Sequence, residues 1–72
     1  SRSSLKEQIR FIEIAYGSLM EVYCQLLMAK DLEYINETQL TQLRTAIDEI
    51  SNKLNALRNS HYKRLNTQQI NK

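Results

Sequence analysis

Apolar residues recur every three or four positions along most of the chain, and no proline interrupts them. This spacing places side chains on one face of an α-helix. Gly17 is the single glycine, so nothing in the sequence marks the turns of a strand-rich fold or a long loop. The spacing therefore predicts an all-α chain. In the first half the recurring apolar positions are Leu5, Ile9, Ile12, Tyr16, Leu19, Tyr23 and Leu26.

Capping signals divide the chain into two long helices. Ser4 and Glu7 form a capping box, in which a serine hydroxyl accepts a hydrogen bond from the backbone three residues on. Asn36 is a good N-cap for a second helix. We expect one helical-hairpin unit, with helices over about 4–32 and 37–65, a turn at 33–36 and a frayed tail at 66–72. The apolar stripe of the second helix is Leu40, Leu43, Ile47, Ile50, Leu54, Leu57 and His61.

The two predicted helices differ in how many neighbours they need. The second has one apolar stripe and polar residues elsewhere, which predicts a single neighbour. The first has a further apolar surface, which predicts at least two neighbours. We therefore expect an antiparallel hairpin that contributes to a four-helix bundle, completed by missing helices or by another copy in a homo-oligomer. The predicted assembly surface comprises Phe11, Ile14, Ala15, Gly17, Met20, Val22, Cys24, Leu27 and Met28.

Three residues in these helices allow a structural and a functional interpretation. Gly17 is either a glycine tolerated at a cost of about 1 kcal/mol or a point where another helix approaches closely. Cys24 is interpreted as a small core side chain, and His61 as a half-buried histidine at the bundle end. The sequence has no phosphate-binding glycine loop or metal-ligand spacing. We expect no enzyme, cofactor or small-molecule substrate.

Residues 11–28 form the most apolar stretch, with 13 hydrophobic residues of 18. Glu13 and Glu21 lie within it, and each carboxylate costs about 2.5–3.5 kcal/mol at mid-bilayer, so a membrane span is not expected. The single cysteine fits a reducing compartment, and no signal-peptide pattern is present, so the sequence predicts a cytoplasmic protein. A start at Ser1 rather than Met suggests a processed product or a fragment.

Charge is unevenly distributed along the predicted hairpin, although the net charge is only +2. Antiparallel pairing brings the start of the first helix to the end of the second, where seven basic residues against two acidic ones give +5; we call this the basic end. The turn end has three basic and six acidic residues, giving −3. The basic end is either a solvated helix end or a site for a nucleic-acid backbone. The predicted RNA contacts are Arg2, Lys6, Arg10, Arg58, Lys63 and Arg64.

Residues 7–35 resemble a known family. The matching pieces include Ile9-Arg10-Phe11, Gly17-Ser18-Leu19, Asp31-Leu32 and Tyr34-Ile35, and residues 50–57 are similar to the last helix of the same family. The chain resembles the bacterial four-helix-bundle proteins named for large-subunit rRNA intervening sequences, often labelled ribosomal-protein-like. It departs from them in lacking their two earlier helices. It also has Glu33 where they typically have glycine.

The resemblance implies a four-helix bundle, frequent ring-like homo-oligomers and no known enzymatic activity. Relatives in diversity-generating retroelements are accessory proteins that contact a reverse transcriptase and RNA. The resemblance therefore favours a bundle-assembly protein with an RNA or ribonucleoprotein partner. The alternative is a purely structural oligomerisation or protein-interaction module that binds no nucleic acid.

Overall fold

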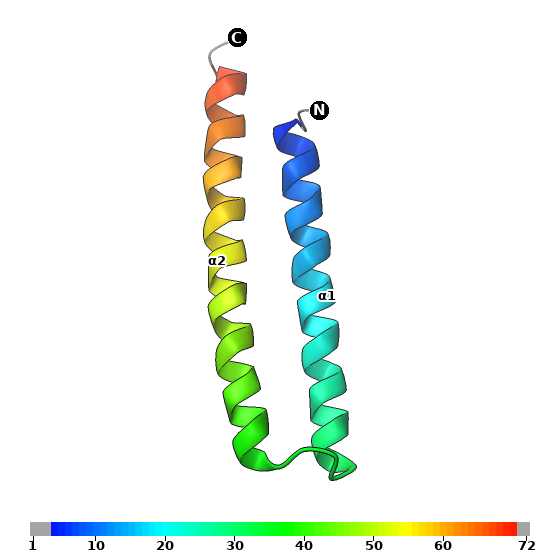
Figure 1. The fold of residues 1–72 in the computed structure, drawn as a ribbon. Helices are drawn as coiled ribbons and strands as arrows, with labels where there is room; N and C mark the ends of the chain where they lie inside the picture. Colours follow the sequence, from blue (N-terminus) through cyan, green and yellow to red (C-terminus); the bar gives the residue numbers. More distant parts are fainter. Residues whose placement is uncertain (1–3, 71–72) are drawn as a thin grey trace.

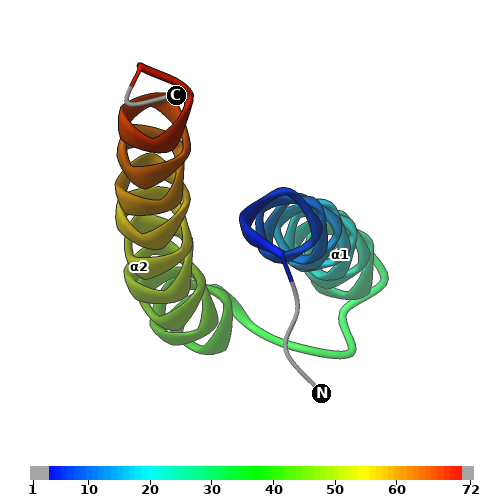
Figure 2. The ribbon, with the colours of Figure 1, turned by 90° about the horizontal axis from the view of Figure 1, so that it is seen from above.

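The computed structural model describes residues 4–70, which form two long antiparallel helices joined by one tight turn. Helix α1 spans Leu5–Asp31 and helix α2 spans Glu37–Ile70. The helices run side by side, with the turn at one end and the start of α1 near the end of α2 at the other (Figure 1). Seen from above, no third layer accompanies them in these residues (Figure 2). The predicted all-α hairpin is confirmed.

Helix α1 begins and ends with backbone hydrogen bonds that its sequence supports. At its start, the Glu7 N–H donates to Oγ of Ser4 at 3.1 Å, as the capping box predicts. At its end, the Tyr34 N–H donates to the Ala29 carbonyl at 2.9 Å and the Glu33 N–H to the Lys30 carbonyl at 3.0 Å. This pair of bonds is a Schellman motif, which satisfies carbonyls that the last helical turn leaves without partners.

The Schellman motif requires a left-handed residue, and here that residue is Glu33, with φ at 66°. Glycine adopts this conformation without the steric penalty of a side chain, which is about 1–2 kcal/mol. We therefore expect Glu33→Gly to raise the free energy of unfolding by up to about 1 kcal/mol, measured by urea denaturation. Glu33→Ala is the control, because it removes the carboxylate but retains the strain. Equal stability of the two variants would contradict a strained Glu33.

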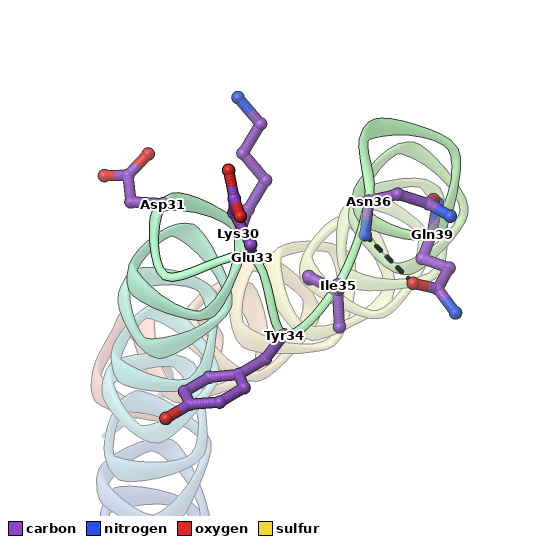
Figure 3. Close-up of a pocket in the computed structure, with 7 residues that line it drawn as sticks. All are labelled: Lys30, Asp31, Glu33, Tyr34, Ile35, Asn36 and Gln39. Atoms are coloured by element: carbon purple, nitrogen blue, oxygen red, sulfur yellow. Dashed lines mark hydrogen bonds between the residues drawn. The ribbon is translucent and has the colours of Figure 1, made fainter.

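The start of α2 has a second reciprocal cap. The Gln39 N–H donates to Oδ1 of Asn36 at 2.8 Å, and the Asn36 N–H donates to Oε1 of Gln39 at 2.9 Å (Figure 3). Nζ of Lys30 lies 3.1 Å from Oε2 of Glu37, which joins the two helices across the turn. The Tyr34 side chain is 79% exposed in the hairpin. The turn is fixed mainly by its backbone and caps.

The contact between the helices is a narrow seam. Ile9 and Ile12 of α1 and Leu40 and Ile47 of α2 are its buried apolar residues. All seven predicted stripe residues of α1 are buried or half-buried, which confirms that stripe. On α2 the seam contains Leu40, Ile47, Leu54 and His61, one every seven residues. Arg44, Ser51 and Arg58 lie between them on the same side, and Leu65 follows His61.

Two polar contacts complete the seam. His61 is buried, and its Nδ1–H donates to the Leu57 carbonyl at 2.8 Å. Its Nε2 lies 2.6 Å from Oε1 of Gln8 on α1. Further along, the Arg44 guanidinium lies 6.0 Å from the centroid of the Tyr23 ring, within cation–π range. Side-chain contacts therefore join the two helices both near the open end of the hairpin and nearer the turn.

Helix α2 continues to Ile70, so the expected end near Leu65 is wrong. Residues 66–70 contain neither glycine nor proline, and glutamine is a good helix former. Oγ1 of Thr67 also donates to the Lys63 carbonyl at 2.9 Å, so its hydroxyl does not compete with the helix. The last turns are helical although they have little apolar surface to bury.

The hairpin is far less compact than a protein of its size that folds alone. Its radius of gyration is 16.5 Å, against about 11 Å for a compact domain of this length. Its accessible surface is 5873 Å², whereas a compact monomer of 8.5 kDa exposes about 4,700 Å². Neither helix in the described part of the chain has a stretch long and apolar enough to cross a bilayer. The hairpin therefore exposes more surface than a compact monomer of its size.

Candidate interaction surfaces

One side of the hairpin is apolar on both helices. On α1, Ala15 and Val22 directly precede the seam residues Tyr16 and Tyr23. On α2, the residues that directly precede Arg44, Ser51 and Arg58 face the same side, because residues in equivalent positions meet along one edge of an antiparallel pair. Phe11 lies one step further round α1. We call this surface the apolar face: Phe11, Ala15, Val22, Leu43, Ile50 and Leu57.

The apolar face is open to solvent. Phe11 is 59% exposed, Ile50 is 48% exposed, and Val22, Leu43 and Leu57 are each more than 40% exposed. The expectation that α2 needs only one neighbour stays a prediction, but its apolar residues extend beyond the surface that α1 covers. Its apolar stripe is wider than the seam, and the row Leu43, Ile50 and Leu57 is left uncovered by α1. Contiguous exposed apolar surface of this kind marks an interaction site more often than scattered residues do.

The opposite side of the hairpin is mixed in character. There, Met20 and Leu27 of α1 face a row on α2 that begins with Thr41 and Asp48 and ends with Asn55 and Tyr62. A hydrogen bond of 3.4 Å from the Tyr62 hydroxyl to Oε2 of Glu13 identifies this side, since it joins the two rows directly. Because the α2 row is polar, this side is a weaker candidate for burial than the apolar face.

The assembly surface predicted from α1 alone is distributed round the helix. Phe11, Ala15 and Val22 belong to the apolar face. Ile14, at 54% exposed, and Met28, at 58% exposed, lie on the back of α1, away from α2. The side that carries Tyr62 holds Gly17, Met20, Cys24 and Leu27. One neighbouring helix cannot cover all of these positions. Because α2 adds an exposed apolar row to the apolar face, that face is the strongest candidate interaction surface.

Gly17 and Cys24 both lie away from the seam. The thiol of Cys24 is exposed, so its interpretation as a core side chain is wrong for the hairpin itself. A methyl group added at Gly17 would meet no atom within 4 Å. Within the hairpin, Gly17 is therefore a tolerated helical glycine with open space beside it.

The structure brings the basic residues to one end but not to one face. Lys6 and Arg10 lie in the first two turns of α1, and Lys63 lies near the end of α2, at the same end of the hairpin; all three are exposed. Arg64 is also exposed and continues the row of Leu57 on the apolar side. Arg58 is half-buried in the seam, so it is less accessible than the other predicted RNA contacts among the described residues. Arg2 lies outside the described residues.

A shallow hollow of about 530 Å³ lies at the turn. The carboxylates of Asp31 and Glu33 and the Lys30 ammonium border it on the α1 side, and Asn36 and Gln39 border it on the α2 side (Figure 3). The amides of the α2 side already bond the backbone of the cap. Within residues 4–70, no group of three histidine, cysteine or carboxylate side chains is arranged to hold a metal ion.

Comparison with known proteins links the chain to a family. The family profile described as 23S rRNA-intervening sequence protein matches residues 1–56, which include all of α1, the turn and more than half of α2. No curated protein and no solved structure matches the chain significantly. The match agrees with the resemblance noted from the sequence.

Proposed function

The chain belongs to the family of 23S rRNA-intervening sequence proteins, and on that basis we propose that it is a non-enzymatic helical-bundle assembly protein. The apolar face is the surface that assembles. Two further helices cover it and complete a four-helix bundle. The observation that supports the proposal is the row Leu43, Ile50 and Leu57 on α2. Each of these large apolar side chains is more than 40% exposed to water.

The physical reason is the balance between apolar burial and chain entropy. Ordering each residue costs about 1–2 kcal/mol in backbone entropy alone, and among residues 4–68 the seam has four buried apolar side chains to offset that cost. Burying apolar surface stabilises the folded state by about 25 cal/mol per Å². Both helices contribute exposed apolar side chains to the apolar face. Covering it stabilises the fold and the assembly together.

We therefore expect the chain not to be a monomer in solution. Light scattering at micromolar concentration should give the mass of a dimer or a larger assembly. The melting temperature should rise with protein concentration, because association stabilises the folded state by mass action. A folded monomer with a cooperative melt that is independent of concentration would refute the assembly function.

A second candidate function is RNA binding through the basic end. The charge of that end and the rRNA in the family description favour it. Lysine and arginine that neutralise phosphates release counterions, so affinity for RNA should fall steeply with salt. Lys6, Arg10 and Lys63 are the leading contacts, because all three are exposed and lie off the apolar face. Arg64 and Arg58 contribute at the edge of the seam, and Arg2 extends the same charge.

This function predicts a difference between two matched lysines of α2. We expect Lys63→Glu to weaken binding to a structured RNA several-fold and to reduce the slope of log affinity against log salt by about one contact. Lys53→Glu makes the same charge change ten residues earlier, outside the basic end, and is expected to have a smaller effect. Fluorescence anisotropy over a salt series measures both. If the unaltered chain shows no salt-sensitive binding, the protein is an assembly module alone.

A further inference from the structure

We infer that one face of α2, on the side of the hairpin opposite the apolar face, binds double-stranded RNA through asparagine side chains. We call this surface the amide face: Asn52, Asn55, Asn59, Tyr62 and Asn66. The inference rests on the proposed RNA-binding function and names the form of RNA and the surface that contacts it. It does not depend on which helices cover the apolar face, because the two faces lie on opposite sides of the hairpin.

The asparagines of α2 share one side of the helix. Steps of three and four residues separate the members of the amide face, so their side chains form one row. All four asparagines of α2 belong to this row. The Tyr62 hydroxyl donates to Oε2 of Glu13 at 3.4 Å, which places the row beside α1.

The asparagines of the amide face are accessible and make no contacts within the hairpin that explain them. Asn52, Asn59 and Asn66 are exposed, and Asn55 is half-buried. Within residues 4–70, no hydrogen bond joins the side-chain amide of any of these four to another residue. Asparagine is among the weaker helix formers, and glutamate, lysine or glutamine would solvate a helix surface at a lower cost. Four asparagines in one row therefore favour a binding role over simple solvation.

Basic side chains border the amide face on both sides at the basic end. On α1, Lys6 lies seven residues before Glu13 and so in the same row, and Arg10 lies between them. On α2, Lys63 is four residues after Asn59 and forms the outer border. All three basic residues are exposed. At this end the amide face is therefore a neutral strip between two positively charged borders.

The contact between Gln8 and His61 places these borders at nearly the same level. Oε1 of Gln8 lies 2.6 Å from Nε2 of His61. Lys6 and Arg10 are each two residues from Gln8, which is a rise of about 3 Å along α1. Lys63 is likewise two residues from His61 on α2. Both borders can therefore meet one ligand that lies along the amide face.

Double-stranded RNA matches this arrangement. Its minor groove is wide and shallow, displays 2′-hydroxyl groups and has a phosphate row on each side. An asparagine amide both donates and accepts hydrogen bonds, as a 2′-hydroxyl does, so the two groups can pair. Lys6 and Arg10 then lie near one phosphate row and Lys63 near the other. The Glu13 carboxylate repels phosphate and limits the contact on the side toward the turn.

Single-stranded RNA and DNA fit the amide face less well. Proteins bind single strands chiefly by stacking the bases on aromatic rings. Tyr62 is the one aromatic residue of the amide face; it is 40% exposed, and its hydroxyl is bonded to Glu13. Phe11, which is 59% exposed, belongs to the apolar face instead. DNA lacks the 2′-hydroxyl, so a DNA duplex should bind less tightly than an RNA duplex.

Removing two amides from the full chain tests the inference. The double variant Asn59→Ala and Asn66→Ala keeps every charge and places a better helix former at both positions, so the helix is retained. Affinity for a short RNA duplex should fall at least about fivefold, because two hydrogen bonds are lost. The slope of log affinity against log salt should not change, because no cation is removed. Fluorescence anisotropy over a salt series measures both quantities.

The matched control is the double variant Ser60→Ala and Thr67→Ala. These exposed residues have the same spacing and lie one residue further along α2, off the amide face. The control should bind the RNA duplex as the unaltered chain does.

Three outcomes overturn the inference. If the asparagine variant binds the RNA duplex as tightly as the control variant, and binding remains salt-sensitive, the amide face is not the contact and the RNA-binding function stands. If a DNA duplex of the same sequence, or the single RNA strand, binds as tightly as the RNA duplex, the ligand is not recognised as double-stranded RNA. If the unaltered chain shows no salt-sensitive binding to RNA, the inference and the RNA-binding function are both wrong.

Discussion

Replacing Ile50 with Glu is expected to dissociate the assembly, with at least a thousand-fold loss of association affinity. Ile50 is 48% exposed in the hairpin, so covering it is worth about half of the 1.5–3 kcal/mol that full burial of an isoleucine gives, and the change removes this gain. It also places a carboxylate in an apolar interface, where burying an unpaired charge costs several kcal/mol more. Each 1.4 kcal/mol is a factor of ten in affinity, so the combined effect exceeds three orders of magnitude. Sedimentation equilibrium over a concentration series measures it.

The matched control is Asn52→Glu, which introduces the same charge two residues away on the exposed polar side of α2. Glutamate is a better helix former than either isoleucine or asparagine, so neither change weakens the helix itself. Asn52→Glu should keep the mass of the unaltered chain. If Ile50→Glu also keeps that mass, the apolar face is not the surface through which the chain assembles.

Local signals in the sequence predict most of the fold. The Ser4 and Asn36 caps are short-range patterns with a direct hydrogen-bond mechanism, and both are observed. The left-handed residue at Glu33 agrees with the glycine that the family resemblance implies at that position. These features depend on neighbours within four residues, so one sequence is enough to find them. The sequence does not predict the end of α2 correctly, because residues 66–70 have little apolar surface to bury and therefore no apolar periodicity.

The rotation of α2 about its own axis could not be predicted from its sequence. The stripe from Leu40 to His61 consists of two interleaved rows, and a helix with one neighbour can turn either row inward. In the structure the row of Leu40 and Ile47 faces α1, together with the polar row that contains Arg44. That choice depends on Tyr23 and Gln8 of α1, which contact Arg44 and His61. Such long-range contacts decide which apolar row remains for a further partner.

The two rows of α2 lead to a prediction about stability. Ile47 is 7% exposed in the seam, and Ile50 is 48% exposed on the apolar face. In an isolated hairpin, Ile47→Ala should cost about 2–5 kcal/mol, and Ile50→Ala much less, because half of its side chain already contacts water. In the proposed bundle both side chains are buried. We therefore expect both variants to lower the free energy of unfolding by about 2–4 kcal/mol per chain at micromolar concentration, measured by urea denaturation.

Ile14→Ala is the control that tests whether removing any exposed isoleucine side chain lowers the free energy of unfolding. Ile14 is 54% exposed, but it lies on the back of α1, where helices that cover the apolar face leave it in water. Alanine is also the better helix former, so this change should alter the free energy of unfolding by less than about 1 kcal/mol. If Ile14→Ala and Ile50→Ala have equally small effects while Ile47→Ala is severe, the apolar face stays in water. A severe Ile14→Ala would instead place another helix against the back of α1, as in a larger bundle. Burial of the apolar face predicts that Ile47→Ala and Ile50→Ala are equally costly and that Ile14→Ala is not.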